Sequence, residues 1–390
     1  MTALITAPGQ TSREAFLEYQ RRGGYAGLAR ARSEGPALTL AALEAARLRG
    51  RGGSGAGNPV AAKWRKVARA QNPTRYVIGN GAESSAVSLK DRHLMRLFPH
   101  RILEGLLIAA SAVEAETACL FVRGDDEEAL ASMRAAVAEA GQAGLLGGVA
   151  VDVQPSMPTS ISGEETAVID ALEGLEGLPQ PKPPRPEESG LRGCPTLLTN
   201  VETLAAAAAV LRLGPDAFCA TGTPDCPGTA LFTVSGAAVE RPGVYEVPYG
   251  TPLIDLLRRA GAPAPDEIEA VLPGGFSSGP LGPHELDIPL TYEDLAAVGT
   301  TLGPAAILVF TKAETDLLTL LTETVSLLTE AACGQCNGCK EGHRRLAAAL
   351  AARDLPLARE QAMILQYGRG NCAHPTGTAR LALRALQLVR

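Results

Sequence analysis

Two segments near the start of the chain, RGRGGSGAG at residues 49–57 and RYVIG at residues 75–79, decide the class of fold that the sequence predicts. The first is a glycine-rich loop that follows a stretch of helical spacing at residues 38–48. The second is a short apolar run that leads into a polar loop at residues 80–85, as a buried strand does. The alternation then continues with predicted helices at 101–115 and 127–140 and predicted strands at 118–122 and 148–153. Strands that alternate with helices predict an α/β domain with a parallel sheet.

The pattern changes twice farther along the chain. A proline-rich segment at residues 178–186 predicts an extended surface loop, and the character of the sequence shifts after Cys226. Predicted strands at 229–235, 243–247 and 305–310, with a helix at 253–260, form a small α+β unit. From residue 312 the spacing is helical almost to residue 390. We therefore predict three domains, at residues 1–226, 227–311 and 312–390.

Composition narrows the class of partner and the location. The 390 residues have a net charge of −6, which argues against a nucleic-acid partner. No uncharged apolar run reaches the ~18 to 20 residues that a membrane-spanning helix needs. Residues 1–13 have neither the basic region nor the apolar region of an export signal. We expect a cytoplasmic protein with no direct membrane span.

The eight cysteines are unevenly distributed. Cys333, Cys336 and Cys339 form a C-x-x-C-x-x-C run, and Cys372 follows 33 residues later. Four thiolates are the usual ligand set of a [4Fe–4S] cluster, so the spacing favours one cluster. A zinc site is the alternative, although zinc sites more often use two separated pairs or histidine, which brings His343 and His374 into consideration. Cysteines 119, 194, 219 and 226 share no spacing, and we assign them no site.

The glycine-rich loop is suited to an anion. Without a Cβ atom, successive backbone N–H groups can converge on a phosphate, although a plain flexible turn would have the same composition. Other polar loops accompany it in the sequence: 80–85, Ser162 to Thr166 and Thr199 to Thr203.

A series of motifs appears in one order from about Leu48 to the C-terminus. They are Arg49-Gly50-Arg51-Gly52-Gly53, Lys90-Asp91-Arg92, Pro99-His100 with Glu104-Gly105, Gly163-Glu164-Glu165-Thr166-Ala167, Leu172-Glu173-Gly174, Pro181-Lys182-Pro183-Pro184, Gly190-Leu191, Pro195-Thr196, Asn200-Val201-Glu202-Thr203-Leu204, Arg241-Pro242-Gly243-Val244-Tyr245-Glu246, Cys333-Gly334-Gln335-Cys336 and Lys340-Glu341-Gly342. This series resembles the NADH-binding flavoprotein subunit (the F subunit) of respiratory complex I and its relatives in soluble hydrogenases and formate dehydrogenases. The resemblance implies a Rossmann-like α/β domain that holds FMN, then a ubiquitin-like β-grasp (SLBB) domain, then a helical bundle with a [4Fe–4S] cluster.

The resemblance also implies a set of FMN-binding residues. They are Gly50, Arg51, Gly52, Gly53, Lys63, Asn80, Glu83, Ser84, Gly163, Glu164, Glu165 and Asn200. Backbone donors and a lysine would oppose the phosphate, and Asn and Glu would bond the ribityl hydroxyls. The cluster ligands would be Cys333, Cys336, Cys339 and Cys372. We assign no catalytic residue.

This chain departs from the family at the nicotinamide pocket. Asn58, Lys66 and Arg185 stand where the family has phenylalanines, Ser85 replaces a glutamate, and Ala82 replaces an aspartate that contacts the flavin. Losing base-stacking rings predicts slow or absent NADH oxidation. Lys66 and Arg185 could instead favour NADPH through its extra phosphate.

Three functional hypotheses follow. The first is an oxidoreductase that takes electrons from NAD(P)H and passes them through FMN and the cluster to a ferredoxin-like or complex I-like redox partner. The second is an electron relay that uses no nicotinamide, and the third is a homologue that keeps only the cluster. On either of the first two hypotheses the protein transfers electrons as one subunit among other redox subunits.

Overall fold

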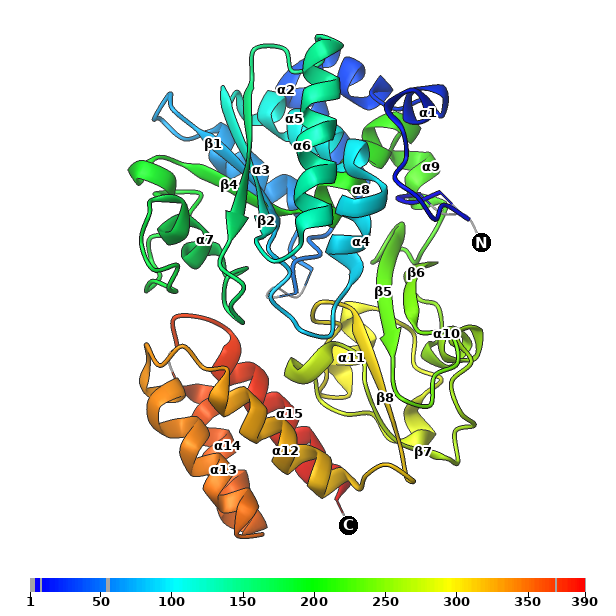
Figure 1. Cartoon of the computed structure of the whole chain (residues 1–390), viewed down its shortest axis with the longest axis vertical. Coiled ribbons are helices and arrows are strands. Elements are labelled where there is room, and N and C mark those ends of the chain that lie inside the picture. The colour runs from blue at the N-terminus through cyan, green and yellow to red at the C-terminus, as the bar shows by residue number, and fades with distance from the viewer. Residues whose placement is uncertain (1–3, 8, 54–56, 369, 390) are drawn as a thin grey trace.

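The computed structural model describes residues 4–7, 9–53, 57–368 and 370–389. The chain forms three units (Figure 1): a large α/β unit, a small unit built on a mixed sheet, and a helical unit at the C-terminal end.

The α/β unit is built on a four-stranded parallel sheet. Its strands are β1 (Tyr76–Gly81), β2 (Thr117–Arg123), β3 (Ala150–Ser156) and β4 (Thr196–Asn200), in the order β3-β2-β1-β4. In the centre of the sheet, Ile78 lies opposite Cys119 on one side and Leu198 on the other. The predicted α/β fold with a parallel sheet is confirmed. Cys119 is buried in β2, as expected of a small apolar residue there.

Nine helices of the described residues belong to this unit. They are α1 (Phe16–Arg21), α2 (Ala26–Ala45), α3 (Val60–Ala68), α4 (Lys90–Leu97), α5 (Pro99–Val113), α6 (Glu127–Gln142), α7 (Glu165–Leu172), α8 (Val201–Leu213) and α9 (Pro215–Cys219). Helices α5 and α8 are almost entirely buried and pack closely on each other. A Cβ atom at Gly105 of α5 would collide with the backbone of Leu204 in α8, so this crossing requires glycine. Small residues in these helices therefore serve close packing.

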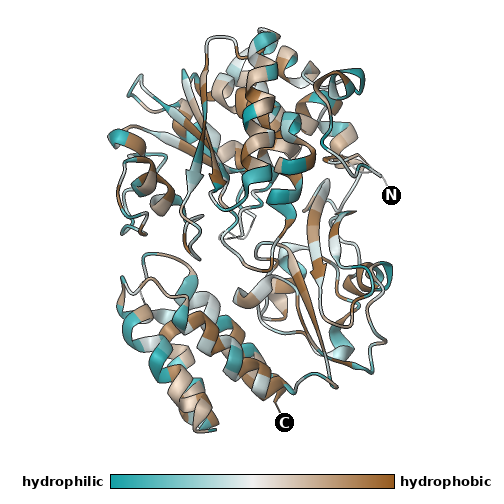
Figure 2. Cartoon of the chain, viewed as in Figure 1, coloured by the Kyte–Doolittle hydropathy of each residue, from teal (hydrophilic) through white to brown (hydrophobic). Residues whose placement is uncertain are grey.

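The second unit has a four-stranded mixed sheet. Its strands are β5 (Thr229–Ser235), β6 (Gly243–Pro248), β7 (Ile268–Leu272) and β8 (Ala306–Thr311), in the order β6-β5-β8-β7. Strands β5 and β8 are parallel, and the two outer strands run antiparallel to them. Helix α10 (Leu253–Ala260) packs into the same apolar core, and α11 (Tyr292–Ala297) follows it in the chain. Figure 2 shows the hydrophobic residues along β5 and β8, which are the most buried strands of this sheet.

The helical unit consists of four packed helices. They are α12 (Leu317–Glu330), α13 (His343–Ala351), α14 (Leu355–Tyr367) and α15 (His374–Leu388). A single π-helical turn, Gly338–Gly342, joins the cysteine run to α13. No helix among the described residues is both long and apolar enough to span a membrane.

Two strands were not predicted. β4 holds only five residues between the Cys194-Pro195 pair and the N-terminus of α8, which is too short for a periodic signal. β7 likewise has five residues and an irregular register with β8. Both are identified by their neighbours in the sheet and not by their own sequence.

Candidate functional site

A cavity of about 420 Å³ lies where the three units meet. The α/β unit contributes Gly52 and Gly53, the mixed-sheet unit contributes Pro304, and the helical unit contributes Cys372. Nine residues of the predicted FMN set line this cavity: Arg51, Gly52, Gly53, Asn80, Glu83, Ser84, Gly163, Glu164 and Asn200. Gly50, Lys63 and Glu165 of the set do not line it. Sequence motifs up to about 150 positions apart thus meet on one surface.

Two glycines of this surface, Gly53 and Gly163, are placed where a side chain would crowd the backbone of another segment. Gly53 has φ +83°, and a Cβ atom there would lie 3.0 Å from the backbone nitrogen of Pro304. A Cβ atom at Gly163 would lie 2.5 Å from the carbonyl oxygen of Ala82. The Asn80 side chain donates to the carbonyl oxygen of Gly163 at 2.9 Å, which ties the end of β1 to the loop before α7. The rest of the predicted glycine loop, residues 54–56, lies outside the described residues.

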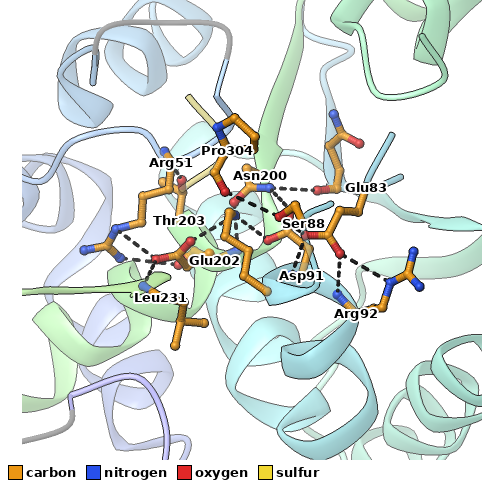
Figure 3. A network of polar contacts seen from close by, with 12 residues as sticks. Arg51, Glu83, Ser88, Asp91, Arg92, Asn200, Glu202, Thr203, Leu231 and Pro304 are labelled. Atoms are coloured by element: carbon orange, nitrogen blue, oxygen red, sulfur yellow. Dashed lines mark hydrogen bonds and ion pairs between the residues drawn. The ribbon is translucent and has the colours of Figure 1, made fainter. Parts of the chain in front are cut away.

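A network of buried charges lies at the wall of the cavity, which Lys90, Asp91 and Asn200 line. Figure 3 shows the polar contacts of this network. Lys90 Nζ lies 2.7 Å from Asp91 Oδ1 and 2.9 Å from Glu202 Oε2. Asn200 Nδ2 donates to Asp91 Oδ2 at 2.7 Å, while Asn200 Oδ1 accepts from the backbone N–H of Glu202 and caps α8. The Asn200 side chain is therefore shared between α8 and the charge network.

The carboxylates of this network affect one another's ionisation. Burial raises the pKa of Asp91 to about 7, and the nearby Glu83 and Glu202 act in the same direction while Lys90 opposes them. Burial alone would lower the pKa of Lys90, but the carboxylates of Asp91, Glu202 and Glu83 together raise it. The amino group of Lys90 stays charged, and Asp91 is the group that can exchange a proton near neutral pH.

Glu83 and Arg51 have structural contacts that the sequence did not indicate. The Glu83 carboxylate accepts from the backbone N–H groups of Asp91 and Arg92, both at 3.2 Å, and so caps the start of α4. Arg51 Nη2 donates to the carbonyl oxygen of Thr229 at 2.7 Å, so its guanidinium group bridges to the mixed-sheet unit.

A second charged group lies beside the cavity around α7. Glu164 Oε2 accepts from the backbone N–H groups of Thr166 and Ala167 and caps the helix. The Glu165 carboxylate lies 3.6 Å from Lys63 Nζ, 3.3 Å from Lys182 Nζ and 3.9 Å from Arg185 Nη1. Burial would raise the pKa of Glu165, but these three cations lower it. Lys63, which was predicted to oppose the phosphate, is the lysine 3.6 Å from Glu165 in this group.

The two basic residues at the altered nicotinamide positions are also paired. Lys66 Nζ lies 2.7 Å from Glu188 and 3.6 Å from Glu187. The Arg185 side chain is 60% exposed, and its Nη1 atom lies 3.9 Å from the Glu165 carboxylate. Ala82 and Ser85 line the cavity, so two of the departures face the predicted flavin site.

The four predicted cluster cysteines lie near one another. Burial raises the pKa of the Cys339 thiol, and Cys336, Cys333 and Cys372 raise it further. Burial and the thiols of Cys333 and Cys336 raise the pKa of Cys372 in the same way. All eight cysteines are free thiols. Among the described residues no three His, Cys, Asp or Glu side chains are gathered closely enough to hold a single metal ion.

The two histidines near the cysteines use their ring nitrogens elsewhere. His343 contacts the carbonyl oxygen of Gly338 at 3.1 Å and the hydroxyl of Thr378 at 2.9 Å. His374 Nε2 donates to the carbonyl oxygen of Leu328 at 2.8 Å. Burial lowers the pKa of both rings. These three contacts favour the four thiols, and not the histidines, as ligands.

Comparisons with known proteins agree with this geometry. The family described as Nuo51 FMN-binding domain matches residues 43–209, and the SLBB domain family matches residues 231–270. The F 2 subunit of NADH-quinone oxidoreductase from Rhizobium meliloti is 36% identical over 83% of this chain and 79% of its own length. The F subunit of NADH-quinone oxidoreductase from Streptomyces coelicolor is 34% identical over 95% of this chain and 86% of its own length. The chain belongs to the family of NADH-quinone oxidoreductase F subunits.

A solved structure extends the similarity to the whole chain. The crystal structure of NAD⁺-reducing [NiFe]-hydrogenase in the H₂-reduced state has a chain that superposes with a TM-score of 0.84. The match has 29% identity and covers 99% of this chain and 68% of that one. The predictions of an F-subunit-like flavoprotein, of FMN as cofactor and of FMN-mediated electron transfer are thereby confirmed. A nicotinamide-independent relay is not favoured, and the relatives are subunits of multi-subunit redox complexes.

Several residues of the site were not assigned from the sequence. The motifs that carried the resemblance include Lys90, Asp91 and Glu202. The sequence did not predict that these three side chains contact one another. Arg380 of α15 also lines the cavity. Its sequence surroundings carry no motif that could have identified it.

Proposed function

We propose that this chain is one component of a redox assembly, in which it oxidises NADH and delivers electrons singly to an iron–sulfur partner. One observation carries the proposal: the Gly52–Gly53 loop and Cys372 line the same cavity. The predicted flavin cradle and a predicted cluster ligand therefore face one space, with no protein layer between them.

The residues present fit FMN. The cavity volume lies within the range of about 300 to 1,000 Å³ that small-molecule sites occupy. Bound FMN would supply the conversion from two-electron hydride chemistry to single-electron transfer. Gly52 and Gly53 leave room for a phosphate against the backbone, and Asn80 and Glu164 present polar atoms along the wall. Lys90 and Asp91 line the cavity, and the contact of Lys90 with buried Glu202 would hold this part of the wall in place.

The donor set of the helical unit fits a [4Fe–4S] cluster bound by Cys333, Cys336, Cys339 and Cys372. We also propose the domain limits 1–226, 227–311 and 312–390. The strand order β6-β5-β8-β7 with one packed helix supports a ubiquitin-like β-grasp for the middle domain. Eight free thiols support a reducing, cytoplasmic location, where redox subunits would be the partners.

NADH is the better candidate donor than NADPH. A 2′-phosphate at Lys66 would have to displace Glu188, which lies 2.7 Å from the amino group, and Glu187 beside it. Arg185 is likewise shared with Glu165. These cations are neutralised and do not form an open phosphate site. The missing phenylalanines still lead us to expect weaker NADH binding than in a pocket that retains them.

Anaerobic reduction of the flavin tests the proposal. NADH should bleach the flavin absorbance to the same end point as dithionite, and NADPH should be slower at equal concentration. The variant Arg185→Phe should tighten NADH binding by roughly 5- to 150-fold, because a stacked ring contributes about 1–3 kcal/mol. Arg345→Phe, an exposed site on α13, is the matched control. Bleaching by dithionite but by neither nucleotide would refute NADH oxidation.

A further inference from the structure

Three cationic side chains line the cavity, and two of them are already neutralised. Arg51 lies 3.6 Å from the Glu202 carboxylate, and Lys90 lies against both Asp91 and Glu202. Arg380 is the exception within the described residues, because no carboxylate lies within ion-pair distance of it. Its only hydrogen bond there runs from Nη1 to the carbonyl oxygen of Ser277, at 3.0 Å. Burial lowers the pKa of Arg380, and no neighbouring anion among the described residues opposes that effect.

The position of Arg380 is fixed by close packing against the mixed-sheet unit. Gly377 lies one turn earlier on α15, where a Cβ atom would come 2.9 Å from the Ser277 Cβ atom. This contact holds α15 against the short turn Gly275–Ser277, with the guanidinium group bonded to the end of that turn. The charge is therefore held at the cavity wall and not on a free surface side chain.

The same corner of the mixed-sheet unit also contacts the glycine loop. A Cβ atom at Gly303 would lie 2.5 Å from the carbonyl oxygen of Gly274, so these two segments are in contact. Pro304, next to Gly303, is the residue that approaches Gly53 most closely. Arg380 and Gly53 therefore contact two joined segments of the mixed-sheet unit, at Ser277 and Pro304, and both line the cavity.

We propose that Arg380, supplied by the helical unit, binds the phosphate group of FMN. A planar guanidinium group matches phosphate oxygens in pairs, and a phosphate dianion in a partly buried cavity requires a cation. Lys63 does not fill this role, because it lies outside the cavity lining and is paired with Glu165. The inference rests on the proposed flavin site and adds a ligand from a second domain.

Titration of flavin-free full-length protein with FMN and with riboflavin tests this assignment, since riboflavin lacks the phosphate. Quenching of flavin fluorescence gives both dissociation constants. Arg380→Gln should weaken FMN binding by roughly 10- to 100-fold, the effect of one hydrogen bond to a charged group. Riboflavin binding should change less than about twofold, because the lost bond is to the phosphate. Arg380→Lys keeps the charge without the planar pair of donors, so its preference for FMN should fall between wild type and Arg380→Gln.

Arg345→Gln, an exposed position on α13, is the matched control and should leave both constants unchanged. Equal weakening of FMN and riboflavin in Arg380→Gln would show a general structural effect and overturn the assignment. Unchanged FMN binding would overturn it as well, while leaving the proposed flavin site intact. Wild-type protein that binds neither flavin would overturn the proposed site itself.

Discussion

Replacing Lys90 with methionine should strongly destabilise the α/β unit. The Lys90 side chain is 2% exposed, and its amino group lies within 2.9 Å of two carboxylates, those of Asp91 and Glu202. At an effective dielectric constant near 20, each contact of this length corresponds to about 6 kcal/mol of attraction, most of which offsets the cost of removing the charges from water. Methionine preserves the length and packing of the side chain but removes the cation that Asp91 and Glu202 share. Breaking a buried pair of this kind costs about 3–5 kcal/mol in the free energy of unfolding.

The size of this effect should depend on pH. Without Lys90, the pKa of Asp91 rises above its value of about 7, because the interaction that opposes burial is gone. At pH 6 Asp91 in the variant can bind a proton and so carry no charge. Glu202 is then the one carboxylate that has lost its contact with Lys90, and it keeps its contact with Arg51. At pH 8 keeping that proton costs additional free energy. We therefore expect a larger loss of stability at pH 8 than at pH 6.

Urea unfolding followed by tryptophan fluorescence is a local assay for this unit. Trp64 is the only tryptophan in the chain and is fully buried in α3. The matched control is Lys66→Met, which removes an amino group that is also 2.7 Å from a carboxylate, that of Glu188, but belongs to a side chain that is 44% exposed. Exposed pairs contribute little, so the control should be indistinguishable from wild type. A Lys90→Met variant as stable as the control at pH 8 would refute the proposed role of the buried network.

Three further outcomes are expected. Cys336→Ser should reduce the iron content of anaerobically prepared protein from about four atoms per chain, whereas Cys194→Ser should not; zinc in place of iron would contradict the cluster. Gly53→Ala should destabilise the protein by more than Gly144→Ala in urea unfolding, and should also weaken FMN binding. Both glycines have positive φ, but the Cβ atom at Gly53 would crowd Pro304 while that at Gly144 meets open space, so equal effects would exclude the contact as the cause. Asp91→Asn should flatten the pH dependence of stability. The folded pKa of about 7 lies above the unfolded value of about 3.9, so the wild-type side chain contributes stability at low pH that is lost as pH rises from ~4 to ~7, and identical pH profiles would disprove this.

Much of the fold was predictable because its signals are local. The alternation of apolar runs and helical spacing located β1, β2 and β3, and the helical spacing after residue 312 located the helical unit. The side chains of the site were harder to predict. Gly52, Gly53 and Asn80 of the predicted set line the cavity, because a motif specifies the backbone of a loop. Lys63 lies outside the cavity lining, and its ion pair with Glu165 could not be predicted because the two residues are about 100 positions apart.

Arg380 is a cavity residue that the sequence did not identify. Its role depends on the contact of α15 with the turn Gly275–Ser277, and the two segments are separated by about 100 residues in the sequence. No periodicity within α15 reports where that helix lies relative to another domain. Residues that a single element positions can be predicted from sequence, whereas residues that two domains position together require the fold.

The contacts around α7 explain why the flavin site and the cysteines belong to one chain. Single-electron transfer requires that the two redox groups stay at a fixed short separation. Ser160 Oγ donates to the carbonyl oxygen of Ala331 at 2.6 Å, and Asn371 Nδ2 donates to the carbonyl oxygen of Pro179 at 3.0 Å. These bonds connect both sides of the α7 segment to the loops that flank the cysteines, and the same segment carries Gly163 of the cavity wall. The segment that shapes one wall of the flavin site thus also holds the cysteine loops in place. A displacement of the cysteine loops would therefore strain the wall of the flavin site, and a displacement of that wall would strain the cysteine loops.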